Sequence, residues 1–128
     1  MIVVDASALV AIALAEPGSD GVTRRLFTDS ERSISPMSVV EATMVLSRIY
    51  SDPRLVVERN LVKAGLRLCP VDADQTAWAQ RAFLAYGKGR HPAKLNLGDC
   101  FSYATAKALD AALLYVGNDF SQTDIKSA

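Results

Sequence analysis

The chain has 128 residues, of which 50% are hydrophobic and 22% are charged, and 14 Lys and Arg residues balance 14 Asp and Glu residues. This composition predicts one folded domain that spans residues 1–128, and it argues against a disordered chain. The net charge of zero argues against a protein that coats nucleic acid through bulk positive charge. The charge is uneven, however, because residues 51–98 are basic and the segments on either side are acidic.

Neither a membrane span nor a signal peptide is expected. The longest unbroken apolar run, Ala8–Ala15, is far shorter than the roughly 18–20 residues that cross a bilayer. No basic residue precedes Arg24, and Asp5 interrupts the apolar N-terminus. Cys69 and Cys100 form no CxxC pair, so free thiols are expected. The sequence therefore predicts a cytoplasmic protein with no membrane partner.

Short β-branched runs alternate with segments of helical spacing along the chain. Ser7 and Ser38 are predicted to cap helices, and Gly65 is predicted to end one. This alternation predicts an α/β fold, with a central, mainly parallel sheet of four to five strands flanked by helices. In chain order, we expect a strand at 1–4, helices at 8–15 and 19–27, a strand at 33–35, helices at 38–49 and 53–64, a strand at 66–71, helices at 72–86 and 97–109, and a strand at 113–116.

Four carboxylates lie where an open parallel sheet places its functional groups, beyond the carboxyl ends of the strands. Asp5 ends the first strand and Asp119 follows the last, while Glu41 and Asp99 lie in the first turns of two helices. Four such anions repel one another unless some are protonated or a cation lies among them. An oxygen-rich site favours Mg²⁺ or Mn²⁺, as one or two ions, and these activate water for attack on a phosphodiester.

Each of these acids also has a purely structural explanation. Asp5 and Asp119 are suited to turns, Asp99 is suited to a helix N-cap, and Glu41 forms a capping-box pattern with Ser38. The prediction of a site therefore depends on the joint placement of all four.

Four segments carry a resemblance to a known family: Val3–Ser7, Ser38–Glu41, Leu97–Cys100 and Gly117–Phe120. In this order and in a chain of this size, they resemble the conserved segments of PIN-domain ribonucleases, and most closely those of the VapC-type toxins of bacterial toxin–antitoxin pairs. The resemblance runs nearly end to end. It implies a PIN fold and an endoribonuclease that uses Mg²⁺ or Mn²⁺ to activate the water that hydrolyses RNA.

The resemblance also implies roles for particular residues and partners. Such toxins form homodimers, and a cognate VapB-type antitoxin blocks the site, often with a basic side chain. The complex then binds promoter DNA through the antitoxin. Carried over by position, the catalytic and metal-binding acids are Asp5, Glu41, Asp99 and Asp119, the last at the most variable position, with Ser7 and Asn118 as supporting residues.

Basic residues offer a path for RNA, with solvated surface charge as the alternative explanation. Tyr86 and His91 are suited to stacking on an unpaired base, although Tyr86 is equally suited to helix packing. The candidate RNA-binding residues are Arg24, Arg25, Lys88, Arg90 and Lys94.

Other classes of protein fit less well. A response-regulator receiver requires clustered acids after the first strand and a Lys after a late strand, and a haloacid-dehalogenase-like phosphatase requires Asp-x-Asp where this chain has Asp5-Ala-Ser7. Two alternatives stay open: a PIN nuclease of RNA processing without an antitoxin, and a catalytically silent PIN-like binding module. A short upstream reading frame that encodes a DNA-binding antitoxin would favour the toxin.

Overall fold

A four-stranded parallel sheet forms the middle layer of the structure, a computed structural model that describes residues 1–128. The spatial order β3-β2-β1-β4 places β1 between β2 and β4, with Val3 opposite Ser33 and Leu113. The chain places β2 and then β3 on one side of β1, and it later places β4 on the other side. In an open parallel sheet, this change of side opens a crevice beyond the carboxyl ends of the two strands where it occurs, here β1 and β4. The strands are β1 (Ile2–Val4), β2 (Arg32–Ile34), β3 (Arg67–Leu68) and β4 (Ala112–Leu114).

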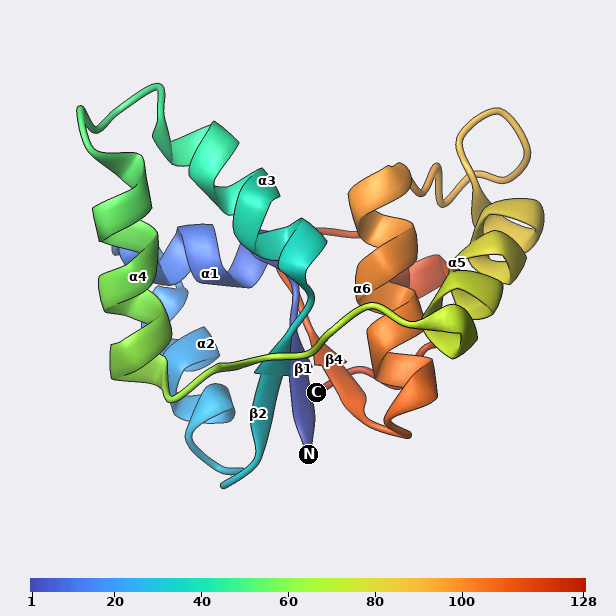
Figure 1. The fold of residues 1–128 in the computed structure, drawn as a ribbon, viewed down its shortest axis with the longest axis horizontal. Coiled ribbons are helices and arrows are strands. Elements are labelled where there is room, and N and C mark those ends of the chain that lie inside the picture. The colour runs from blue at the N-terminus through green and yellow to red at the C-terminus, as the bar shows by residue number, and fades with distance from the viewer.

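Helices cover both faces of the sheet (Figure 1). The alternation of side chains along β1 divides the core in two. Ile2 and Val4 pack against the first four helices, and Val3 packs against the last two. The helices of the first face are α1 (Ala6–Ala13), α2 (Ser19–Leu26), α3 (Pro36–Leu46) and α4 (Pro53–Ala64), and those of the second are α5 (Ala73–Tyr86) and α6 (Leu97–Ala108).

Every element expected from the sequence is present, and the α/β fold with a parallel sheet is confirmed. The helix α4 has the expected bounds, because the Asp52 side chain caps its first turn and Gly65 ends it in the left-handed conformation, with φ of 61°. The strand expected at 66–71 is shorter, since only Arg67 and Leu68 pair with β2, at the edge of the sheet.

Two predicted helix caps are wrong, in the same way. The helix α1 begins directly after β1, and Asp5 rather than Ser7 caps it. Likewise Ser35 caps α3 by accepting a hydrogen bond from the Met37 amide, so Ser38 lies inside the helix. The residues that end the two strands therefore also begin the two helices, which leaves no linker at this edge of the sheet.

The C-terminal segment returns alongside β4 after a short 3₁₀ helix, Phe120–Gln122. The Leu113 amide donates to the Lys126 carbonyl at 2.8 Å, and Asp124 accepts hydrogen bonds from Tyr103 and Lys107 of α6. No helix of the structure has the length and apolar character that a membrane crossing requires.

Candidate active site

A cleft of about 340 Å³ opens at the carboxyl edge of the sheet, between the N-terminal ends of α1 and α6 and the side of α3. The four carboxylates singled out from the sequence all line it: Asp5, Glu41, Asp99 and Asp119. Segments far apart in the chain thus bring four acids together, as the joint placement of these acids predicted.

Asp5 is buried at the back of the cleft, with 3% of its surface exposed. Its Oδ2 accepts hydrogen bonds from the Ser7 amide at 3.0 Å and the Ser7 hydroxyl at 2.6 Å. Its Oδ1 accepts a bond from the Ser102 hydroxyl of α6 at 2.5 Å. The Ser7 Oγ in turn accepts a bond from the Val116 amide at 3.0 Å, which ties α1 to the segment after β4. Both Asp5 oxygens are therefore held in a fixed orientation.

Asp99 lies in the first turn of α6, where it forms a capping box with Asn96. The Asp99 amide donates to Asn96 Oδ1 at 2.8 Å, and the Asn96 amide donates to Asp99 Oδ2 at 3.0 Å. Asp99 is thus the third residue of the helix and not its N-cap. Burial, followed by the negative charges of Asp5, Asp119 and Glu41, raises the pKa of this carboxyl to about 7.

Glu41 reaches the cleft from the second turn of α3. Burial, together with the charge of Asp5, raises the pKa of its carboxyl above the ordinary value. A Cβ atom on Gly98 would overlap the Glu41 carboxylate, so this acid lies directly against the backbone at the start of α6. The capping box that the sequence suggested between Ser38 and Glu41 is absent, because α3 begins at Pro36.

Asp119 and Asn118 follow the end of β4. Asp119 is exposed and lines the cleft immediately before the 3₁₀ helix. Asn118 is also exposed but does not line the cleft, and its backbone carbonyl accepts a hydrogen bond from Ser121. The structure therefore brings Asp119 to the other three acids and leaves Asn118 at the rim.

Three further polar residues at the site were not predicted. Asn96 and Ser102 each lie three residues from Asp99, a spacing that places side chains together around a helical turn and so carried a usable signal. Glu16 lines the cleft from the turn after α1, and its Glu-Pro-Gly context gave no sign of this.

The five basic candidates do not line the acidic cleft. Arg24 and Arg25 lie on α2, and Arg25 bonds to Thr28. The other three, Lys88, Arg90 and Lys94, surround a separate hollow of about 540 Å³ in the loop before α6.

An aromatic pair, between the last residue of α5 and that loop, has a structural role. The rings of Tyr86 and His91 pack edge to face, with their centres 5.1 Å apart. His91 Nδ1 also accepts a hydrogen bond from the Ala93 amide, so this side chain helps to hold the loop in shape.

The donor set of the cleft suits a hard divalent cation. All four acids offer oxygen, as Mg²⁺ and Mn²⁺ prefer, and a cation would offset the burial and the repulsion that raise the pKa of Asp99. No group of three or more His, Cys, Asp or Glu side chains is closed tightly enough to hold a metal ion as it stands. The carboxylates therefore fit the ion by the chemistry of their oxygens.

A parallel sheet in the order β3-β2-β1-β4, with acids gathered at its carboxyl edge, agrees with the PIN fold that the resemblance in sequence implied. The family model described as PIN domain matches residues 2–126. The solved structure of Mycobacterium tuberculosis VapC20, described as a sarcin–ricin loop cleaving toxin, has a TM-score of 0.75 and 18% identity, and the match covers 100% of this chain and 98% of that one. This likeness shows a shared fold.

Curated relatives narrow the class further. Ribonuclease VapC of Mycolicibacterium smegmatis is 41% identical over 124 residues, which are 96% of this chain and 96% of that protein. Ribonuclease VapC36 of Mycobacterium tuberculosis is 42% identical over 126 residues, 97% of this chain and 91% of that protein. The chain therefore belongs to the PIN-domain family and, within it, to the VapC ribonucleases, the toxins of VapBC toxin–antitoxin systems. The family and the ribonuclease activity expected from the sequence are confirmed.

Proposed function

We propose that the cleft at the carboxyl edge is the active site of a metal-dependent endoribonuclease, in which the four acids hold one or two Mg²⁺ or Mn²⁺ ions. The observation that carries this proposal is the state of Asp99, which is buried and whose pKa is raised to about 7 beside three other carboxylates. When its acids are ionised, such a cluster destabilises the folded chain unless a cation lies among them.

The residues of the chain divide the work within this site. Asp5, held from both sides by Ser7 and Ser102, is the fixed point of the donor set. Asp99 and Glu41 line the same cleft and add their oxygens to the donor set. Asp119 is the acid most open to solvent, so it lies where an RNA phosphate first meets the site. When bound, the divalent cation supplies the Lewis acidity that activates water and stabilises the leaving oxygen of the phosphodiester.

RNA cleavage by the purified chain tests this proposal. We expect it to cleave single-stranded or loop RNA with Mg²⁺ or Mn²⁺, and we expect EDTA to abolish the cleavage. The variants Asp5→Asn and Asp99→Asn keep the size of the side chain but remove the charge and replace one acceptor oxygen by an NH2 group, and both should be inactive. Cleavage by both variants at the parent rate would refute the assignment of the site.

The partner of the toxin is, in this proposal, a VapB-type antitoxin that places a basic side chain in the acidic cleft. The charge of the four carboxylates supports this, because an Arg or Lys head group offsets their repulsion as a cation does. The complex then reaches promoter DNA only through the antitoxin. Expression without the antitoxin should arrest growth, and expression of Asp5→Asn should not.

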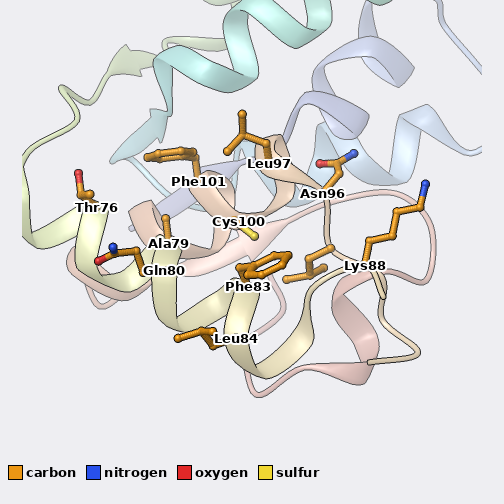
Figure 2. Close-up of a pocket in the computed structure, with 11 residues that line it drawn as sticks. Thr76, Ala79, Gln80, Phe83, Leu84, Lys88, Asn96, Leu97, Cys100 and Phe101 are labelled. Carbon is orange, nitrogen blue, oxygen red and sulfur yellow. The ribbon is translucent and has the colours of Figure 1, made fainter. Parts of the chain in front are cut away.

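We further propose a homodimer through the apolar surface beside the cleft. On α3, Val40 and Met44 are 58% and 66% exposed, and on α6 Leu97 is 67% exposed. Val40, Met44 and Leu97 line a hollow beside α3. Leu97 also lines a second hollow, of about 600 Å³, between α5 and α6 (Figure 2). The exposed residues Phe83 and Leu84 belong to the lining of this second hollow. A continuous apolar surface of this kind is typical of an interface between identical chains.

The RNA-binding residues of the proposal are Arg24 and Arg25 on one flank, and Lys88, Arg90 and Lys94 on the loop before α6. The loop residues support it best, because they are exposed and lie just ahead of the helix that carries Asp99. Charge-reversal variants of the loop should weaken RNA binding and reduce its dependence on salt.

In this proposal, residues 1–128 form one domain, and the toxin acts in the bacterial cytoplasm. The similarity to the VapC relatives supports both points. The same relatives weigh against a nuclease of RNA processing without an antitoxin. Turnover by the purified chain separates the proposal from a silent binding module.

A further inference from the structure

Two buried hydroxyls join α3 to α6 beneath the acidic cleft. Ser38 Oγ of α3 lies 2.9 Å from Ser102 Oγ of α6, and both residues are fully buried. Ser102 Oγ also lies 2.5 Å from Asp5 Oδ1. The contact therefore connects helices on opposite faces of the sheet with the acid at the end of β1.

The hydrogen bonds in this chain run in one direction. A carboxylate oxygen only accepts, so the single hydroxyl hydrogen of Ser102 points to Asp5. Ser38 must then donate its own hydrogen to Ser102. The result is a directed series, Ser38 to Ser102 to Asp5, that ends on a charged acceptor, and such bonds strengthen one another in a dry interior.

The pair also lies one helical turn from two other acids. Ser38 precedes Glu41 by three residues on α3, and Ser102 follows Asp99 by three residues on α6. Residues three apart share a helix face, so the hydroxyl contact sets the separation of the two helix faces that carry these like-charged acids. Glu41 and Asp99 repel each other, and the contact between the serines resists their separation.

We infer that Ser102 and Ser38 are positioning residues of the active site: Ser102 fixes the Asp5 carboxylate directly, and Ser38 acts through Ser102. This inference rests on the proposed metal-dependent function. It assigns to two residues outside the donor set the task of holding three of the four acids ready for a cation, Asp5 by a direct bond and Glu41 and Asp99 through the spacing of α3 and α6.

Mn²⁺ binding to the whole chain, measured by electron paramagnetic resonance without RNA, tests the inference separately from activity. Ser102→Ala leaves Asp5 Oδ1 without its donor and should weaken Mn²⁺ binding about tenfold or more. Ser38→Ala should weaken it roughly threefold, and it should have no further effect in the Ser102→Ala background. Cleavage should then recover to near the parent rate at saturating Mn²⁺, since the reacting groups remain.

Thr105→Val is the matched control. Thr105 lies one turn beyond Ser102 on the same helix, is equally buried, and bonds to Gln75 instead of to an acid of the cleft. The control should bind Mn²⁺ as the parent chain does, even if its melting temperature falls.

The outcomes are distinguishable. If the parent binds Mn²⁺, Asp5→Asn does not, and Ser102→Ala binds as tightly as the parent, the inference is wrong and the proposed metal site stands. Equal loss of affinity in Ser102→Ala and Thr105→Val also overturns the inference, since it marks a general structural effect. Failure of the parent to bind Mn²⁺ overturns both.

Discussion

The carboxylate of Glu41 occupies the space that a side chain at position 98 would need. A Cβ atom added to Gly98 would lie 2.9 Å from Glu41 Cδ and closer still to Oε2. Only glycine therefore allows the acid on α3 to lie against the first turn of α6, beside Asp99.

Gly98→Ala should lower RNA cleavage roughly 100-fold, because it displaces Glu41 from the cleft. Alanine is the better helix former by about 1 kcal/mol, so the free energy of unfolding should fall little or not at all. Cleavage rates together with urea unfolding check both halves of this prediction.

Gly21→Ala is the control for that variant. Gly21 is also helical, and the nearest atom to an added Cβ is Arg24 Nη2, at 3.9 Å. It should leave cleavage unchanged. A Gly98→Ala chain as active as Gly21→Ala would show that the close approach of Glu41 is not needed.

Without metal, the chain should lose stability as the pH rises. The pKa of Asp99 is about 7 in the folded chain and 3.8 ordinarily, so the folded state binds this proton more tightly than the unfolded state does. The associated stability is fully present below about pH 4 and is lost as the pH rises through about 7. Glu41 shifts in the same direction.

Asp99→Asn should remove much of this dependence. The stability of the metal-free variant relative to the parent should therefore be greater at pH 8 than at pH 4, by about 4 kcal/mol. Urea unfolding in EDTA at both pH values measures it. Asp110→Asn, at an exposed position with φ of 50°, should keep the slope of the parent. Parallel pH profiles for the parent and Asp99→Asn would contradict the account of this carboxyl.

Divalent cations should stabilise the fold. At a Mn²⁺ concentration about 100 times the Kd, a single site adds roughly 3 kcal/mol, and the melting temperature should rise by several degrees. EDTA should reverse the shift, and Asp5→Asn should abolish it. A shift of the same size in Asp5→Asn would place the ion elsewhere.

Leu97→Lys should convert the proposed dimer to a monomer, because it places a charge at the centre of the apolar surface between α3 and α5. Val62 on α4 is 81% exposed and lies outside that surface, so Val62→Lys is the matched control and should remain dimeric. Sedimentation equilibrium measures both masses. A parent chain that is monomeric, or a Leu97→Lys chain that stays dimeric, would reject this interface.

The sequence predicted where the acids lie better than what holds them. Asp5 and Asp119 end or follow apolar strands, and parallel strands share a carboxyl edge, so their convergence could be expected from their placement along the chain. The bond between Ser102 and Asp5 spans 97 positions of the chain and depends on two helices meeting over the end of β1. The spacing of Ser102 from Asp99 indicated only that these two share a helix face, and no local pattern encodes the contact with Asp5.

The errors at the helix starts have a related cause. Ser7 and Ser38 are good N-cap residues by type. However, the strand before each helix ends a few residues ahead of them, so the helices begin there and Asp5 and Ser35 are the N-caps. Residue preference alone could not separate these candidates, because all four can accept a hydrogen bond from a helix amide. The strand ends, set by pairing in the sheet, decided between them.

Mapping of RNA ends is the most direct test of the central claim. Total RNA is incubated with the parent chain and with Asp5→Asn, each with Mg²⁺ and with EDTA, and new ends are located by sequencing. We expect discrete new ends only with the parent chain and Mg²⁺. The same ends in the Asp5→Asn reaction or in EDTA, or no new ends in any reaction, would contradict a metal-dependent endoribonuclease site at Asp5, Glu41, Asp99 and Asp119.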